Sequence, residues 1–538
     1  MDQSLVGEVQ AWIADDPDPI TASQLQQWLD TNNEAELRIS FNGFLQFGTA
    51  GLRGPIRPGP SGMNCAVVGR TAAGLVAYMK ERNLTSVVIG RDARYGSEDY
   101  TFETAEIMSG AGMKVFVLPR PLPTPVLAFA TNELGCDVGI MVTASHNPPQ
   151  DNGYKVYLGG TVDSIEYRGS QIVSPTDVSI AQKIDAITSL KEQSRGKEWT
   201  VLGEEIIQKY IDRTASLATK PGSLRIVYTA MHGVGTETLQ QVFHKAGFLS
   251  PILVEAQAAP DPDFPTVAFP NPEEPGAIDL ALETAKSFDA DLVIANDPDA
   301  DRCAAAVNDP ATGWRMLRGD ELGAILGESI ARKSQTGIFA NSIVSSSILK
   351  KIAEHYKIEF TETLTGFKWL AKIKNLTFGY EEALGYSVDA KTVNDKDGIS
   401  AAITLAQIAT DLASDGKTLL NLLDEIWSRH GFHATEQISI RLSDLSKVGV
   451  ILGGLRSNPP QNIAGRAVTS IDDLAAPTDG LPPTDGLRIW LDGGVRIIIR
   501  PSGTEAKMKC YIEVIEKDSK TAQVVLDQLR PPLKELLS

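Results

Sequence analysis

Short apolar runs recur along the chain and alternate with longer segments of helical periodicity. The runs are rich in β-branched residues and read SVVIG (86–90), KVFVL (114–118), DVGIMV (137–142), RIVYTA (225–230) and DLVIA (291–295). Continuous apolar strands of this kind are typical of parallel sheets that helices cover on both faces. Residues 69–83 and 237–248 carry apolar positions three and four residues apart, as in amphipathic helices. The alternation predicts an α/β protein.

The C-terminal part of the chain, about a hundred residues, changes character. It contains four segments that look like antiparallel strands before a closing helix, at 434–442, 486–492, 494–501 and 508–516. We therefore expect a separate α+β domain there. Residues 456–486 are rich in Pro, Asn, Asp and Gly, which predicts a surface loop.

Charge and hydropathy exclude several classes of partner. The chain has 50 Lys and Arg against 68 Asp and Glu, a net charge of −18, so it has no general attraction to nucleic acid or to an anionic membrane. An anionic substrate would need a local basic pocket. No apolar run approaches the roughly 18 residues of a membrane helix, and the first residues lack the pattern of a signal peptide. We expect a cytoplasmic protein with neither nucleic acid nor membrane as a partner.

Cysteine and histidine spacing gives no sign of a soft metal site. The four cysteines, at 65, 136, 303 and 510, form no CxxC pair, and the six histidines show no helical HxxxH spacing. We expect reduced and mostly buried thiols, without a disulfide framework or a zinc centre.

A serine follows the apolar strand at 137–142, in the sequence TASHNP (143–148). Ligands of α/β sheets bind at the carboxyl ends of strands, so Ser145 is a candidate nucleophile. The alternative is that Ser145 caps the next helix and that His146 only packs. The motif alone does not decide between the two.

Three carboxylates follow the strand at 291–295, in NDPDADR (296–302). Asp297, Asp299 and Asp301 alternate in one short loop, where they can converge on a single cation. A set of ligands made only of oxygen favours Mg²⁺ over zinc or copper. The alternative is a solvated acidic turn, but carboxylates this close repel one another when no cation lies between them.

Two further segments have the composition of binding loops. RPSGTEAK (500–507) combines Arg500 and Lys507 with two hydroxyls and a glycine, and its backbone N–H groups and Arg fork suit a phosphate. GYEEALGY (379–386) places Glu381 and Glu382 in a glycine-flanked loop, where carboxylates can accept hydrogen bonds from a sugar. By itself, the first segment is equally compatible with an ordinary hairpin turn, and paired glutamates such as those of the second usually form only a solvated helix start.

Together with FGTAGLRG (47–54), these segments resemble the α-D-phosphohexomutase superfamily, the phosphoglucomutases and phosphomannomutases. The arginine, serine, aspartate, glutamate and phosphate loops follow one another in the order of that family, from about residue 40 to 515. DNGYKVY (151–157), TLTGFKWL (363–370) and DKDG (395–398) are most similar to the branch that contains the second type of phosphoglucomutase and the phosphopentomutases.

The resemblance implies three doubly wound α/β domains plus a C-terminal α+β domain around a central cleft. We place these domains at 1–205, 206–320, 321–433 and 434–538. They are expected to carry, in that order, the phosphoserine loop, the metal loop, the sugar loop and the phosphate loop.

The resemblance also implies an activity. The chain is expected to be an isomerase, a phosphosugar mutase that interconverts hexose 1-phosphate and hexose 6-phosphate through a phosphoserine and a sugar bisphosphate. Ser145 carries the phosphate, and one of its oxygens joins Asp297, Asp299 and Asp301 around Mg²⁺. A sugar 1,6-bisphosphate is the expected activator.

Further residues match positions of the family. Arg53 and Arg302 are expected to stabilise the transferring phosphoryl group. Lys155, in preference to His146, is expected to accept the proton of the attacking hydroxyl. This role would require a lowered pKa for the lysine. The residues expected to bind the sugar and its resident phosphate are Lys368, Glu381, Glu382, Lys396, Arg500, Ser502, Gly503, Thr504 and Lys507.

The glutamate loop departs from the Gly-Glu-x-Ser pattern of many hexose mutases, because Ala383 removes one sugar-contacting hydroxyl. Glucose phosphate is the first expected substrate, mannose phosphate the second and pentose phosphate the third. The alternatives are a glucose-1,6-bisphosphate synthase or phosphopentomutase of the same branch, a metal-dependent phosphatase, and a catalytically silent sugar-phosphate sensor. The sequence leaves the oligomeric state open.

Overall fold

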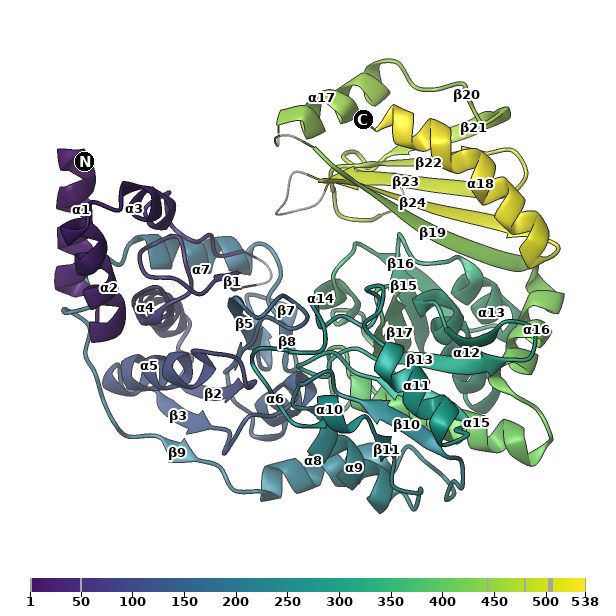
Figure 1. Ribbon diagram of the computed structural model, residues 1–538, viewed down its shortest axis with the longest axis horizontal. Coiled ribbons are helices and arrows are strands. Elements are labelled where there is room, and N and C mark those ends of the chain that lie inside the picture. Colours follow the sequence, from purple (N-terminus) through teal and green to yellow (C-terminus); the bar gives the residue numbers. More distant parts are fainter. Residues whose placement is uncertain are drawn as a thin grey trace. The chain divides into compact units, whose positions relative to one another are not determined.

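The computed structural model describes residues 2–48, 51–442, 444, 446–478, 480–501 and 507–537 (Figure 1). It divides into two compact units. The first comprises residues 1–317, 371–374 and 383–411, and the second comprises 318–370, 375–382 and 412–538. Within the described part of the chain, no helix combines the length and the hydropathy needed to cross a membrane.

Three short helices open the first unit: α1 (Gln3–Asp15), α2 (Pro19–Asp30) and α3 (Glu34–Ser40). Each begins with a side chain that accepts a hydrogen bond from the helix backbone, as N-caps commonly do. Their apolar faces form a small core of their own, made of Leu5, Val9, Leu25 and Leu37.

The first sheet has the order β1-β5-β4-β2-β3-β9, with β8 beside β5. Strands β4, β2, β3 and β9 are parallel, whereas β5 is antiparallel to β4 and β1 is antiparallel to β5. Its strands are β1 (Leu52–Pro55), β2 (Ser86–Arg91), β3 (Lys114–Val117), β4 (Val138–Val142), β5 (Asp151–Leu158), β8 (Ser170–Gln171) and β9 (Thr200–Val201), and β6 (Thr161–Val162) and β7 (Ile165–Glu166) form a separate hairpin. The accompanying helices are α4 (Cys65–Glu81), α5 (Ser97–Gly110), α6 (Thr124–Glu133) and α7 (Thr176–Asp185).

The second sheet, also in the first unit, has the order β11-β10-β12-β13-β14. Strand β10 (Ile226–Thr229) is parallel to β11 (Ile252–Leu253) and β12 (Leu292–Ala295), while β13 (Ala304–Asp309) and β14 (Gly313–Met316) add antiparallel strands. Its helices are α8 (Glu205–Ala215), α9 (Gly235–Lys245), α10 (Glu255–Ala258) and α11 (Asp279–Ser287). All five apolar runs of the sequence form strands of these two sheets, which confirms the α/β prediction.

A third sheet belongs to the second unit, where β15 (Ile338–Ser342) is parallel to both β16 (Glu359–Thr363) and β17 (Leu376–Glu381). The helices around it are α12 (Gly319–Lys333), α13 (Ile348–Tyr356), α14 (Phe367–Leu370) and α16 (Leu419–His430). Strand β18 (Gly385–Ser387) and most of α15 (Gly398–Ser414) belong to the first unit.

The C-terminal sheet is antiparallel, with the order β19-β24-β23-β22-β21-β20. Its elements are β19 (Phe432–Arg441), α17 (Ser446–Ser457), β20 (Asn462–Ile463), β21 (Arg466–Asp473), β22 (Leu487–Leu491), β23 (Val495–Pro501), β24 (Lys507–Glu516) and α18 (Ser519–Leu536). Helix α18 packs on this sheet through Leu526, Leu529 and Leu533 (Figure 1). The expected α+β character is therefore present.

One prediction for this region is wrong. Residues 456–486 were expected to be a surface loop, but they contain β20 and β21. Few side chains of these strands are buried, so the alternation that normally reveals a strand is weak. Their strand structure comes instead from backbone pairing with each other and with β22.

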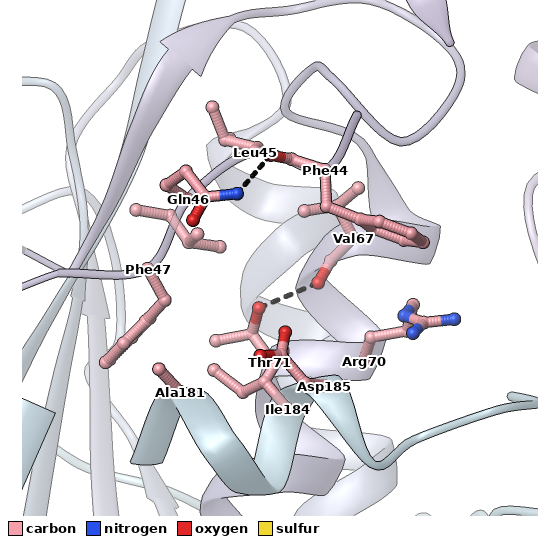
Figure 2. A pocket seen from close by; sticks show the side chains of 11 residues that line it. Phe44, Leu45, Gln46, Phe47, Val67, Arg70, Thr71, Ala181, Ile184 and Asp185 are labelled. Carbon is pink, nitrogen blue, oxygen red and sulfur yellow. Dashed lines mark hydrogen bonds between the residues drawn. The ribbon is translucent and has the colours of Figure 1, made fainter. Parts of the chain in front are cut away.

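A small cavity of about 100 Å³ lies in the first unit (Figure 2). Segment 44–47 with Leu52, helix α4 and helix α7 line it, and the Arg70 guanidinium stacks over the ring of Phe44 at 4.7 Å. Leu52, the first residue of β1, lines this cavity, and the next residue of the strand is Arg53.

Candidate active site

Ser145 lies just beyond the carboxyl end of β4, as the sequence predicts. Ser145 is only 3% exposed. Its backbone φ is +52°, in the left-handed region that residues other than glycine rarely adopt. Its N–H donates a hydrogen bond to Oγ1 of Thr143 at 2.9 Å. Backbone strain of this kind is typical of functional sites, where surrounding contacts hold it in place.

Arg94 provides most of those contacts. Its guanidinium donates hydrogen bonds to the carbonyl oxygens of Ser145 (2.7 Å), Asn147 (2.5 Å), Pro148 (2.8 Å) and Asp151 (3.1 Å). The sequence prediction missed this residue. Its place could have indicated it, because Arg94 follows β2, and the carboxyl end of β2 lies beside that of the parallel strand β4.

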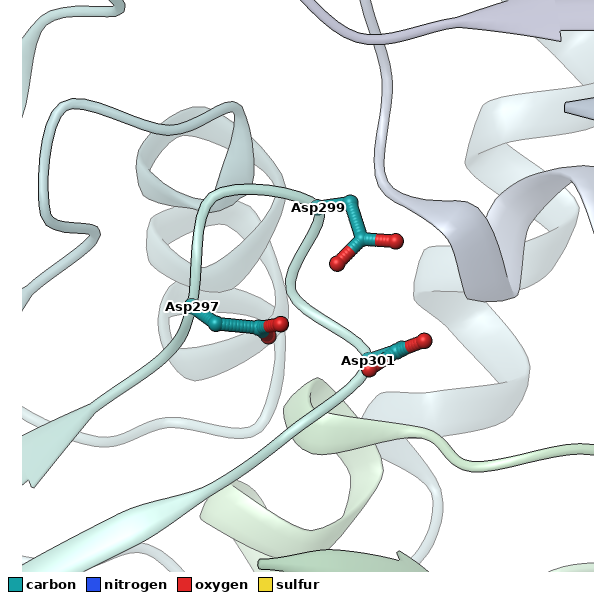
Figure 3. Close-up of side chains that lie close together, drawn as sticks. All are labelled: Asp297, Asp299 and Asp301. Atoms are coloured by element: carbon teal, nitrogen blue, oxygen red, sulfur yellow. The ribbon is translucent and has the colours of Figure 1, made fainter. Parts of the chain in front are cut away.

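The three aspartates occupy the loop between β12 and β13 and point toward a common centre (Figure 3). All three are buried, and one carboxylate oxygen of each lies within 4.8 Å of the others. Ala300 has a φ of +54°, which turns the loop sharply between Asp299 and Asp301. The predicted convergence of Asp297, Asp299 and Asp301 is therefore present.

The hydrogen bonds of the triad show which oxygens remain open. Asp297 accepts the Ser145 hydroxyl on Oδ2 (2.7 Å) and the Arg302 N–H on Oδ1 (3.0 Å). Oδ2 of Asp299 accepts from Lys155 Nζ (2.7 Å), and Oδ2 of Asp301 lies 3.0 Å from the same Nζ.

The other oxygens, Oδ1 of Asp299 and Oδ1 of Asp301, are buried without a hydrogen-bond partner among the residues described. Buried carboxylate oxygens are rarely left unsatisfied, and Mg²⁺ prefers oxygen ligands of this kind. The residues therefore fit a bound Mg²⁺.

Burial and nearby charge set the ionisation of the triad. Burial, together with the charges of Asp299 and Asp301, raises the pKa of Asp297 well above its usual value. Burial also disfavours ionisation of Asp301, but the cations Lys155 and Lys396 outweigh it and lower the pKa of that carboxyl. A divalent cation in this place would favour the ionised form of all three.

Lys155 is buried on β5, and its two carboxylate partners outweigh the effect of burial and raise its pKa. The lowered pKa that proton abstraction would require is therefore absent in this arrangement. His146 differs, because burial and the charges of Arg302 and Arg53 lower its pKa well below the usual value. Its Nδ1 lies 3.2 Å from Oγ of Ser145.

The remaining predicted cations of the first unit surround this centre. Arg53 donates from Nη1 to Oδ1 of Asn147 at 3.2 Å. Nε of Arg302 lies 3.9 Å from Oδ2 of Asp297, and Nζ of Lys396 lies 3.1 Å from Oδ2 of Asp301. The loop that leads to Arg53 needs glycine, because a Cβ on Gly51 would lie 1.8 Å from a carbonyl oxygen of β5.

Apart from Lys396, the predicted sugar-binding residues lie in the second unit. Oε1 of Glu381 accepts from the N–H of Gly366 at 2.5 Å, in the loop that leads into α14, where Lys368 lies. Oε2 of Glu382 accepts from the hydroxyls of Ser342 (3.1 Å) and Ser345 (3.0 Å). Both carboxylates therefore accept hydrogen bonds from groups of their own unit.

The predicted phosphate loop is described only at its ends. Arg500 lies near the end of β23, partly exposed, and Lys507 begins β24. Ser502, Gly503 and Thr504 lie outside the described residues.

Comparison with known families matches four successive domain models along the chain. They are the phosphoglucomutase/phosphomannomutase alpha/beta/alpha domains I (residues 45–189), II (208–313) and III (318–430), and the C-terminal domain (456–529). Helices α1 to α3 precede the first match.

Individual relatives extend over most of the chain. A probable phosphomannomutase of Haemophilus influenzae is 47% identical over 482 residues, which cover 88% of this chain and 98% of the relative. A phosphopentomutase of Mus musculus is 33% identical and covers 99% and 95%. Among solved structures, a putative phosphomannomutase from Thermus thermophilus has the same fold, with a TM-score of 0.69, 22% identity and coverage of 91% and 99%. The chain therefore belongs to the phosphoglucomutase/phosphomannomutase family, whose members are phosphosugar mutases and thus isomerases.

Proposed function

We propose that this protein is a Mg²⁺-dependent phosphosugar mutase that carries a phosphoryl group on Ser145 and works through a sugar bisphosphate. The observation that carries the proposal is the 2.7 Å hydrogen bond from Oγ of Ser145 to Asp297. This bond places the Ser145 hydroxyl against the buried aspartate triad. Two oxygens of the triad have no hydrogen-bond partner among the described residues. A cap or a packing residue would have no need of this contact.

The residues divide the work of phosphoryl transfer, which depends mainly on positioning and charge stabilisation. Asp297, Asp299, Asp301 and a phosphate on Ser145 would hold Mg²⁺, which would neutralise their negative charge. Arg53 and Arg302 stabilise the charge of the transferring group.

Lys155 and His146 are the candidates for the proton of the attacking hydroxyl. Lys155 would have to leave the two carboxylates that bind it now, whereas His146 already lies beside the serine oxygen. We therefore propose His146, ahead of Lys155, as the group that accepts this proton.

The second half of the proposal concerns the sugar. Glu381 and Glu382, with the cations Lys368 and Lys396, bind the sugar and its phosphates. The resident phosphate is held by the loop of Arg500, Ser502, Gly503, Thr504 and Lys507. The bisphosphate turns over while it is bound, so the same loop holds either phosphate.

Hexose phosphate remains the first proposed substrate, glucose before mannose. The relative with 47% identity is named a probable phosphomannomutase, which supports a hexose, and the Mus musculus relative is named a phosphopentomutase, which keeps pentose phosphate open. Ala383 in the sugar loop is consistent with a site that lacks one hydroxyl contact.

A coupled assay tests the substrate. Glucose, mannose, ribose and N-acetylglucosamine 1-phosphates are each supplied with Mg²⁺ and the matching bisphosphate, and kcat/KM is compared. We expect the highest value for glucose 1-phosphate. A preference of tenfold or more for ribose 1-phosphate would replace the hexose proposal with phosphopentomutase activity.

The Ser145→Ala variant tests the mechanism. It should show no phosphorylated species by intact mass after incubation with bisphosphate, and turnover should fall by several orders of magnitude because a covalent nucleophile is lost. Ser40→Ala is a matched control, since Ser40 is a buried serine of α3 whose hydroxyl has no hydrogen-bond partner among the described residues. Turnover near that of wild type in Ser145→Ala would refute the mechanism.

The same assay separates the other functions. A bisphosphate synthase consumes its phosphoryl donor in proportion to product, whereas a mutase needs only catalytic amounts of bisphosphate. A phosphatase releases inorganic phosphate continuously. We expect neither stoichiometric use of the donor nor continuous release of phosphate, because a phosphate loop in the C-terminal domain suits retention of the sugar bisphosphate.

A further inference from the structure

Thr124 makes two hydrogen bonds to one residue of the metal loop. Its backbone N–H donates to the carbonyl oxygen of Asp299 at 2.9 Å, and its hydroxyl donates to Oδ2 of the same aspartate at 2.6 Å. The side chain is fully buried, and 175 positions of sequence separate the two residues. A contact so far apart in sequence requires both sheets of the first unit to be in place.

Thr124 stands at the start of a helix without serving as its cap. It is the first residue of α6, and the N-cap position before it, where threonine commonly caps a helix, is held by Pro123. Helix α6 has no side-chain cap, whereas the N-cap residues of α4 and α18, Asn64 and Asp518, each accept a hydrogen bond from their own helix. The hydroxyl of Thr124 therefore donates to Asp299 and does not cap α6.

This contact determines which oxygen of Asp299 stays open. Oδ2 accepts from two donors, Thr124 Oγ1 and Lys155 Nζ, while Oδ1 is buried without a partner in the described part of the chain. Two donors on one oxygen fix the rotation of the carboxylate about its Cβ–Cγ bond. A fixed carboxylate keeps Oδ1 available to a cation at the triad, where each aspartate has an oxygen within 4.8 Å of those of the others.

The two donors differ in what else they can do. Lys155 also binds Asp301 and is a candidate for proton handling, so it can exchange partners during the reaction. Thr124 carries no charge and starts a helix that is packed against the sheet, so its donor stays in place. Thr124 can hold Asp299 whichever partner Lys155 has.

We propose that Thr124 is a positioning residue that holds Asp299 in the orientation required for Mg²⁺ binding. The inference rests on the proposed Mg²⁺ site, and it goes beyond it by assigning a function to a residue outside the ligand set. Groups that hydrogen-bond to metal ligands typically contribute about 10- to 100-fold to metal affinity or activity.

The test compares Thr124→Val with Thr124→Ser in the full-length protein. Valine keeps the shape and removes the donor, whereas serine keeps the donor. Titration calorimetry with Mg²⁺, and with Mn²⁺ as a spectroscopic probe, should show affinity about 10- to 100-fold weaker in Thr124→Val and within about threefold of wild type in Thr124→Ser. The rise in Tm on addition of Mg²⁺ should shrink in the valine variant, and kcat should fall more than KM changes.

Thr131→Val is the matched control. Thr131 is buried on the same helix, and its hydroxyl donates to the carbonyl oxygen of Leu127 at 2.9 Å, away from the metal loop. This variant loses a comparable hydroxyl and should keep wild-type Mg²⁺ affinity, whatever its Tm. Equal loss of affinity in both valine variants would mean that α6 acts only through general stability and would overturn the proposal.

Two further outcomes separate this inference from the proposed function. Wild-type affinity in Thr124→Val would overturn the role of Thr124 and leave the mutase proposal standing. Failure of the wild-type protein to bind Mg²⁺ or Mn²⁺ would overturn the metal site itself, and with it this inference. If Thr124→Val does not fold, Thr124→Ala provides the same comparison, since it also lacks the donor.

Discussion

Oγ of Ser145 donates a hydrogen bond of 2.7 Å to Oδ2 of Asp297, which lies 152 positions later in the sequence. Only the free hydroxyl can make this bond. A phosphoserine has no hydrogen to donate there and adds about 1.5 to 2 negative charges at neutral pH. Phosphorylation of Ser145 therefore replaces an attraction with a repulsion, and a cation between the two groups removes that repulsion.

We accordingly predict that phosphorylation of Ser145 tightens Mg²⁺ binding by about tenfold or more, a typical size for coupling between two sites. Titration calorimetry on the phosphorylated and unphosphorylated protein measures the difference directly. Ser145→Ala should bind Mg²⁺ like the unphosphorylated wild type. Equal affinity of the two wild-type forms would contradict the arrangement of phosphate, metal and Asp297 that we propose.

Arg94 should resist replacement by lysine. One guanidinium donates to the carbonyl oxygens of Ser145, Asn147, Pro148 and Asp151, and an ammonium cannot reproduce that fork. We expect Arg94→Lys to lower the rate of Ser145 phosphorylation by bisphosphate by about tenfold or more, since a small displacement of a reacting group is costly. Quenched-flow labelling measures this rate. A phosphorylation rate equal to that of wild type would show that the serine loop keeps its shape without the fork.

Arg500→Ala should weaken the sugar 1-phosphate and the sugar 6-phosphate by a similar factor, because each presents its resident phosphate to the same loop. A charge-assisted bidentate contact contributes roughly 1.5–3 kcal/mol, about ten- to a hundredfold in affinity. KM or Kd for both monophosphates is the measurement. Arg466→Ala is a control in the same sheet, where Arg466 binds the backbone of Asp492. Weakening of only one monophosphate would require two separate phosphate sites.

Asp397 should make the first unit less stable as the pH rises from 4 to 7. Burial raises its pKa to about 6, although its Oδ1 accepts from Tyr210 (2.9 Å) and from the N–H groups of Ile399 and Ser400. A raised folded pKa favours the protonated form, so the stabilisation is fully present below about pH 4 and is lost as the pH rises through about 6.

The comparison is with Asp397→Asn, which cannot ionise. The difference in unfolding free energy, wild type minus variant, should fall by about 2–3 kcal/mol between pH 4 and pH 7, as calorimetry at several pH values would show. Asp518 provides a control whose stability should change with pH in the opposite direction. A hydrogen bond from the N–H of Thr521 lowers its pKa, so its contribution to stability should be lost as the pH falls. A difference that does not change with pH would contradict the raised pKa of Asp397.

Much of the fold could be predicted because its signals are local. Apolar runs such as 137–142 and 291–295 identify buried strands from a few neighbouring residues, and β4 and β12 lie where those runs predicted. The same locality explains the failure at 456–486, where β20 and β21 bury few side chains and depend on backbone pairing with residues elsewhere in the chain. The domain boundaries near 205, 320 and 433 stay a prediction.

The site follows the same division. Ser145 and the three aspartates could be found from the sequence, because each motif is short and directly follows an apolar strand. Arg94 and Thr124 belong to no recognisable motif, and each acts on a loop more than fifty positions away, so only the place of Arg94 after β2 offered any signal in the sequence. Sequence alone determined the serine and the carboxylates that the site brings together. Tertiary structure alone decided which carboxylate oxygens are occupied and which stay open, because hydrogen bonds between distant loops depend on how the strand ends meet in space.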